Sequence, residues 1–303
     1  CCLIVNCLTV YFNFINTSTN KEFINQQEAD LLFKEILSLE LPYGYLLANC
    51  HNLSHFVYLF LNKKGISSEK IWAFSPSVYA QNQQELISFT DKKNISPSGK
   101  IDWGYHVAPI VNVQIKNKIH QMVIDPALFP NRMVSYRTWL SKIRTKKLIY
   151  LIMDGQWYLF NSALITHAEF HDIQKSFEYP ILPNYILPDW FSDKLITDFF
   201  KYDDFSQQNH WLEKGLAINA TALHFYHDEV EPLLKTKSEA QKLNDYKNLV
   251  GNVFNFETIF RDYTYNYEMD EVFHAQYQFI IEKYRALYEA ELVKWQIKIN
   301  ELN

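Results

Sequence analysis

Three residues whose types suit nucleophilic catalysis follow one another in the first half of the chain: Cys50, His106 and Asp125. A cysteine thiolate can attack an amide carbon, a histidine can move the proton, and a carboxylate can hold the imidazole in position. These residue types suit acyl-transfer chemistry, provided that the fold brings the three side chains together.

Cys50 stands at the predicted start of a helix over residues 50–64. Asn49 is a suitable N-cap, and Gly65 is a suitable C-cap. The apolar face of this helix consists of Leu53, Phe56, Val57, Phe60 and Leu61. Unpaired N–H groups and the positive dipole end at a helix start stabilise a thiolate, which favours a nucleophile at this place. The alternative is a small, inert apolar cysteine.

A predicted hairpin carries the other two residues. Its strands cover residues 106–115 and 119–124 and are joined by the polar turn at residues 116–118. His106 opens one strand and Asp125 closes the other, so both lie at the same end of the hairpin. With the turn centred on Asn117, Asp125 would lie opposite Pro109, and a bulge or bend must complete its approach to His106.

Strings around these residues resemble the protein-glutaminase family, bacterial cysteine enzymes that deamidate glutamine side chains within proteins. The strings are WGYHVAP at residues 103–109, VIDPALF at residues 123–129 and TWLS at residues 138–141. His55 also fits the family pattern, whereas Asn49 and Leu53 stand where the family has glycine and arginine. The resemblance extends over roughly residues 43–145.

This resemblance implies that Cys50 is the nucleophile, His106 the general base and then the acid, and Asp125 the orienting group. The expected substrate-binding residues are Trp103, Tyr105 and His55, with buried packing as the alternative for the two aromatic residues. The implied reaction converts an exposed glutamine of a protein substrate to glutamate through a thioester. It requires no cofactor.

Other functions use the same residues. A lysine amine that reaches the thioester before water would make the chain a transglutaminase, and attack on a backbone amide would make it a cysteine protease. The non-enzymatic alternative is a papain-like binding module. The retention of Cys50, His106 and Asp125 together favours an enzyme.

Pairs of histidines at helical spacing are the only hint of a metal site. They are His51 and His55, His167 and His171, and His224 and His227. None of these pairs has a clear third ligand nearby in the sequence, so no metal is expected.

Composition narrows the classes of partner. The chain has 303 residues, of which 48% are hydrophobic and 16% aromatic, and a formal net charge of −5. This balance argues against a dedicated nucleic-acid binder and against binding to a membrane surface. The cysteines Cys1, Cys2, Cys7 and Cys50 are placed too unevenly for a disulfide framework, which predicts a free thiol at Cys50.

The patterns and the resemblance together predict an α+β fold. A papain-like or transglutaminase-like catalytic domain with an antiparallel sheet is expected over residues 20–178, a proline-rich linker over residues 179–190, and a mostly helical domain over residues 191–303. Residues 1–19 are expected to be the remnant of a secretion signal or an N-terminal strand. We therefore expect a bacterial protein that is secreted or translocated into a host cell, with the helical domain docking a partner or selecting the substrate.

Further elements follow from periodicity. A helix is expected over residues 22–39, a strand over residues 71–74, and a long helix along the apolar stripe from Phe273 to Ile299. Residues 148–153 and 156–160 are expected to form a second hairpin around Asp154 and Gly155, a dipeptide that favours two-residue turns.

Overall fold

A computed structural model of the chain describes residues 20–79, 84–143, 148–158, 208–236, 239–251, 256 and 268–302. The predictions for residues 1–19 and for the linker at residues 179–190 lie outside these described residues. Among the described residues, no helix combines the length and the apolar character needed to cross a membrane.

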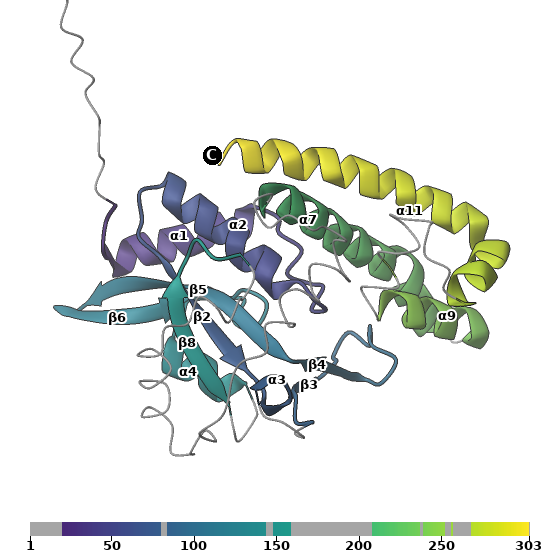
Figure 1. The fold of residues 1–303 in the computed structure, drawn as a ribbon, viewed down its shortest axis with the longest axis horizontal. Helices are drawn as coiled ribbons and strands as arrows, with labels where there is room; N and C mark the ends of the chain where they lie inside the picture. Colours follow the sequence, from purple (N-terminus) through teal and green to yellow (C-terminus); the bar gives the residue numbers. More distant parts are fainter. Residues whose placement is uncertain are drawn as a thin grey trace, which may run out of the picture.

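The core of the fold is a six-stranded, mainly antiparallel sheet (Figure 1). Its main path runs β7–β6–β5–β2–β8, and β1 pairs in parallel with β5. The strands are β1 (Ile24–Asn25), β2 (Glu69–Phe74), β5 (Tyr105–Ile115), β6 (Lys118–Val123), β7 (Val134–Ser135) and β8 (Ile149–Asp154). A separate two-stranded sheet consists of β3 (Ile87–Thr90) and β4 (Lys100–Trp103), and the short helix α3 (Pro76–Tyr79) follows β2.

Helices cover both faces of the large sheet. Helices α1 (Gln26–Ser38) and α2 (Cys50–Lys63) pack on one face, and α4 (Tyr136–Lys142) packs on the other (Figure 1). Alternate residues of β5 serve the two faces: Val111 and Val113 belong to the core with α1 and α2, whereas Ala108 and Ile110 belong to the core with α4. The α+β architecture with an antiparallel sheet agrees with the sequence prediction.

The hairpin of β5 and β6 is confirmed, but its register differs by one residue from the predicted one. The turn has two residues, Lys116 and Asn117, and both have positive φ, at 48° and 62°. Ile110 therefore faces Val123, and continuing this register places Asp125 opposite Ala108. Residues 106 and 108 share a face of β5, so the shorter turn puts Asp125 on the same side as His106.

Two other predictions needed changes. Helix α1 starts at Gln26, because Ile24 and Asn25 pair with β5 and Asn25 then forms a capping box with Glu28. The prediction of a second hairpin around residues 154 and 155 is wrong for the described residues, since β8 pairs with β2 and residues 156–158 form no strand. Residues 159 and 160 lie outside the described residues. A Cβ atom on Gly155 would lie only 2.4 Å from the ring of Tyr58, so close packing explains the glycine.

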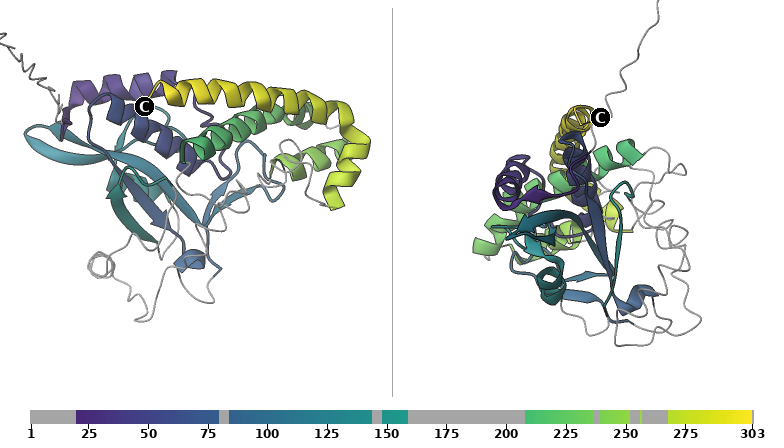
Figure 2. Two further views of the ribbon diagram at one scale, coloured as in Figure 1. Left: turned by 45° about the horizontal axis from the view of Figure 1, so that its top comes forward. Right: turned by 90° about the vertical axis from the view of Figure 1, so that its left-hand side faces the viewer.

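The described residues of the C-terminal region are mostly helical and share a hydrophobic core with α2. The region contains α7 (Gln208–Phe225), the π-helical turn η4 (Tyr226–Val230), α8 (Glu231–Thr236), α9 (Ala240–Val250) and α11 (Glu268–Asn300), which is kinked at Tyr277. Helices α7 and α11 run side by side (Figure 2). Trp295 of α11 makes an edge-to-face contact with Phe56 of α2, and Trp211 and Leu216 of α7 belong to the same hydrophobic cluster.

Candidate active site

Cys50 is the first residue of α2 and has a free, partly exposed thiol. Asn49 occupies the N-cap position, but its amide donates to the carbonyls of Pro42 (2.9 Å) and Tyr45 (3.0 Å) instead of capping the helix. The first backbone hydrogen bond of the helix runs from the N–H of Leu53 to the carbonyl of Asn49 (3.1 Å). The N–H groups of the first turn before Leu53 thus have no acceptor within the helix.

His106 and Asp125 form a buried pair on β5 and just after β6. The Nε2 of His106 lies 2.8 Å from Oδ2 of Asp125, and the two side chains are only 4% and 6% exposed. Trp139 of α4 donates its indole N–H to the same carboxylate oxygen (2.7 Å), and the backbone N–H of Leu128 donates to the other oxygen (3.3 Å). Three donors therefore hold the carboxylate in position.

The charges of this pair are mutually stabilising. Burial opposes a charged imidazole, but the charge of Asp125, its hydrogen bond and the neighbouring Cys50 raise the pKa of His106 to about 9. For Asp125, burial acts to raise the pKa, and the charge and hydrogen bond of His106 together with the donors of Trp139 and Leu128 lower it below its ordinary value. An imidazolium facing a carboxylate is thus the stable state at neutral pH.

The geometry leaves the other nitrogen of His106 for the thiol. Nδ1 is buried and makes no well-aligned hydrogen bond to any residue that the structure describes. Cys50 lies close enough to raise the pKa of His106 through hydrogen bonding and charge. One small cavity is lined by Cys50, His106 and Asp125 together, along with Tyr43 and Ser54. The fold therefore brings together the three residues expected to carry the chemistry.

Two indole rings support the imidazole. Trp103 stacks on His106 with ring centres 4.3 Å apart and planes 13° apart, and Trp139 lies at 5.4 Å and 19°. The N–H of Trp103 donates to the carbonyl of Leu46 (2.8 Å), which ties the loop before Cys50 to β4. The hydrogen bond from Trp139 to Asp125 was not predicted from the sequence, because Trp139 appeared there only within the string TWLS. Trp139 can donate this bond because α4 packs on the sheet that carries His106.

The other expected substrate-binding residues are buried. Tyr105 shares a hydrogen bond with Nδ1 of His51 (3.0 Å) and lies near Cys50, whose charge adds to burial in raising the pKa of Tyr105. His55 is 2% exposed, its Nδ1 lies 2.8 Å from Nζ of Lys70, and its ring stacks with Tyr58. We therefore place His55 behind the active site, in the packing between α2 and the sheet.

The histidine pairs have other partners. His51 and His55 belong to the buried packing of α2, His227 faces Glu231 (3.0 Å), and His224 faces Glu291 (3.9 Å). His167 and His171 lie outside the described residues. Within the described part of the chain, no group of three or more side chains is arranged to hold a metal ion.

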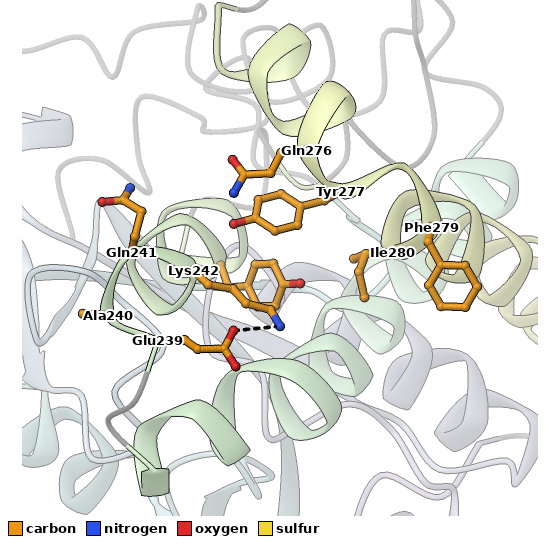
Figure 3. Close-up of a pocket in the computed structure, with 9 residues that line it drawn as sticks. Glu239, Ala240, Gln241, Lys242, Gln276, Tyr277, Phe279 and Ile280 are labelled. Carbon is orange, nitrogen blue, oxygen red and sulfur yellow. Dashed lines mark ion pairs between the residues drawn. The ribbon is translucent and has the colours of Figure 1, made fainter.

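An open hollow lies far along the sequence from these residues, between α9 and the start of α11 (Figure 3). Tyr246, Tyr277 and Ile280 line it, and Glu239 forms an ion pair with Lys242 (3.2 Å) at its edge. It contains none of the residues proposed for catalysis.

A partly exposed cysteine at a helix start, beside a buried histidine–aspartate pair on an antiparallel sheet, is an arrangement that suits the chemistry of a cysteine hydrolase or acyltransferase. Residues 11–143 match the model of a family described as glutaminase. This segment contains Cys50, His106 and Asp125, and over it the chain is similar to glutaminases, in agreement with the strings noted in the sequence. The match indicates an enzyme of the glutaminase type.

Solved structures similar to the chain include an NMR structure of protein-glutaminase from Chryseobacterium proteolyticum, with 17% identity, 56% of this chain and 97% of that chain covered, and a TM-score of 0.37. A crystal structure of protein-glutaminase has 18% identity, the same coverage and a TM-score of 0.35. A crystal structure of pro-protein-glutaminase has 17% identity, 62% of each chain covered and a TM-score of 0.36. No curated protein matches the chain.

Proposed function

We propose that this enzyme deamidates glutamine side chains in proteins through a catalytic triad of Cys50, His106 and Asp125 on a papain-like domain. The observation that supports the triad most directly is the His106–Asp125 pair at 2.8 Å in a cavity that Cys50 also lines. The partly exposed thiol supports a substrate that reaches in from solvent. A glutamine side chain suits this position, because its carboxamide stands at the end of a flexible stem.

The reaction follows from the bond to be broken. The Cys50 thiolate attacks the carboxamide carbon, and protonated His106 gives its proton to the departing ammonia, which leaves a thioester. Neutral His106 then takes a proton from water, the resulting hydroxide attacks the thioester, and the thiolate leaves as glutamate forms. Asp125 keeps Nε2 of His106 occupied throughout, so that Nδ1 exchanges the protons.

The tetrahedral intermediate carries a negative oxygen, and the start of α2 offers donors for it. The backbone N–H groups of the first helical turn have no acceptor within the helix, and that of Cys50 is nearest to the reacting carbon. We assign the oxyanion site to this N–H group.

Export from a bacterial cell, or delivery into a host cell, belongs to the same proposal and rests on the similarity to the protein-glutaminase family. Fractionation of the producing bacterium checks it: the expected result is protein outside the cytoplasm, and retention in the cytoplasm contradicts it.

Mass spectrometry tests the function. Incubation with a protein that exposes glutamine should release ammonia and add about 1 Da for each glutamine converted, and Cys50→Ser should do neither. A crosslinked product would identify a transglutaminase, and shortened fragments would identify a protease. An unchanged substrate, with bound enzyme recovered on it, would favour the non-catalytic binding module.

A further inference from the structure

The C-terminal helix α7 contacts the catalytic helix two residues after the nucleophile. The side-chain N–H of Asn52 donates to Oδ1 of Asn219 on α7 (2.6 Å), and the hydroxyl of Tyr158 donates to Oδ1 of Asn52. All three side chains are fully buried. The amide of Asn52 is therefore held at both its oxygen and its nitrogen.

The backbone of α7 also comes unusually close at this point. Gly215 lies one turn before Asn219 on the same face of α7, and a Cβ atom built there would lie 2.5 Å from Oδ1 of Asn52 and 2.7 Å from its Nδ2. Only glycine allows this approach, since the atoms that a side chain would meet are themselves held by hydrogen bonds. Two residues of α7, Gly215 and Asn219, thus contact the same side chain of α2, that of Asn52.

From Asn52 the buried polar groups continue toward the thiol. The ring of Tyr158 lies 5.7 Å from that of His51, and His51 shares a hydrogen bond with the hydroxyl of Tyr105 (3.0 Å). Tyr105 lies within the electrostatic reach of Cys50 and of Tyr158. The first turn of α2 is therefore bounded by polar contacts from α7, from β5 and from the residues after β8.

We propose that Asn219 is a positioning residue, which holds the first turn of α2 through Asn52 and so sets the place of the Cys50 thiol relative to His106. The inference rests on the proposed function of Cys50 and assigns to the C-terminal region, which lies outside the family match, a part in that reaction. Small displacements of a nucleophile are costly, since about 1 Å can lower a rate by roughly 100-fold.

Two nearly isosteric variants test the acceptor. Asn219→Leu removes the oxygen that Asn52 donates to, and Asn219→Asp keeps it. We expect Asn219→Leu to lower kcat on a short glutamine peptide by about tenfold or more with little change in KM, and to slow alkylation of Cys50 by iodoacetamide. Asn219→Asp should recover most of both rates.

Thr221→Val is the matched control on the same helix. Thr221 is fully buried and its hydroxyl bonds only the carbonyl of Ala217 among the contacts described (2.8 Å), so its loss should lower the melting temperature without changing either rate. If Asn219→Leu behaves as Thr221→Val does, Asn219 has a structural role alone and the proposal is overturned. Should Asn219→Leu fail to fold, Gly215→Ala displaces the amide of Asn52 by steric contact, and wild-type rates in that folded variant also overturn the proposal.

The alkylation rate separates this inference from the proposed function. It reports the accessibility and ionisation of Cys50 in the full chain and needs no substrate. If the enzyme fails to deamidate protein, the proposed function is refuted. If Cys50 is nevertheless alkylated more slowly in Asn219→Leu than in Asn219→Asp and Thr221→Val, the positioning role of Asn219 is supported.

Discussion

At the scale of single residues, the proposed active site depends on how the carboxylate of Asp125 is held. Oδ2 of Asp125 accepts hydrogen bonds from His106 and from Trp139, and these donors lower its pKa. The same carboxylate raises the pKa of His106 to about 9 against the effect of burial. Variants of Asp125 and of Trp139 separate the effect on the pKa of His106 from the effect on the pKa of Asp125.

The first prediction concerns Asp125→Asn. Without the carboxylate, burial dominates and the pKa of His106 falls, so the alkaline limit of activity should move from about pH 9 to lower pH, with a rate lower by roughly 100-fold or more. The pH dependence of kcat/KM measures both. An unchanged alkaline limit would mean that His106 does not supply the proton.

The same pKa shifts set the pH dependence of stability. The raised pKa of His106 adds stability that is complete below its unfolded value of about 6.5 and is lost as the pH rises through about 9. The lowered pKa of Asp125 adds stability that is complete above its unfolded value of about 3.9 and is lost as the pH falls below it. Asp125→Asn should remove the dependence due to Asp125 and reverse the one due to His106, because burial then lowers the pKa of His106 and the folded state loses stability as the pH falls.

The second prediction compares Trp139→Phe with Trp103→Phe. Both variants keep an aromatic ring beside His106, but only Trp139 donates to Asp125, since Trp103 donates to Leu46. Losing that donor destabilises the carboxylate, so Trp139→Phe should raise the pKa of Asp125, move the acidic limit of activity to higher pH and lower the rate by about tenfold. Equal acidic limits in the two variants would remove Trp139 from the support of Asp125.

At the scale of elements, the turn between β5 and β6 decides which way Asp125 points. Its two residues both have positive φ, which asparagine and glycine tolerate and β-branched residues do not. With a two-residue turn, the register of β5 and β6 places Asp125, which follows β6, on the same side of the sheet as His106 of β5. The carbonyl of Pro109 still accepts from the N–H of Ile124 (2.9 Å), although proline cannot return a bond to the ladder.

The third prediction tests that turn. Asn117→Val should cost about 1–2 kcal/mol of unfolding free energy because φ at this position is 62°, whereas Asn117→Gly should be nearly neutral. Both should keep wild-type kcat below their melting temperatures, because the turn stands at the far end of the hairpin from His106. Urea denaturation and peptide assays measure the two quantities, and a stable Asn117→Val variant would contradict the assigned turn.

At the scale of the whole molecule, the C-terminal helices complete the hydrophobic core around α1 and α2. Trp295, near the C-terminal end of α11, is fully buried and contacts Phe56 on the apolar face of α2. The N-terminal end of α11 lies beside α9 (Figure 2). A chain ending near Pro188 would lack these helices and expose the apolar face of α2. We expect such a truncation to lose its fold, and a folded, active truncation would show that the helices are dispensable.

The fourth prediction makes this quantitative with single residues of α11. Trp295→Ala should cost about 3–5 kcal/mol of unfolding free energy, as for other buried tryptophans. Val293→Ala, at a side chain that is 55% exposed, should change it by less than about 0.5 kcal/mol. Equal effects in urea denaturation would show that α11 does not pack against α2.

The sequence by itself determined the parts of this protein that depend on local spacing. The helix that begins at Cys50 and ends before Gly65, the hairpin that carries His106, and the antiparallel character of the sheet follow from periodicity and turn residues. The three proposed catalytic residues came from their types, their order and the strings around them.

Tertiary structure decided what depends on contacts between distant segments. Trp139 reaches Asp125 only because α4 packs on the sheet, and β8 pairs along its length with β2, a strand that lies far earlier in the chain. The side of β5 on which Asp125 falls changed with a single turn residue, because side chains alternate along a strand. The contact of Asn219 with Asn52 joins residues 167 positions apart, a distance over which local patterns carry no information.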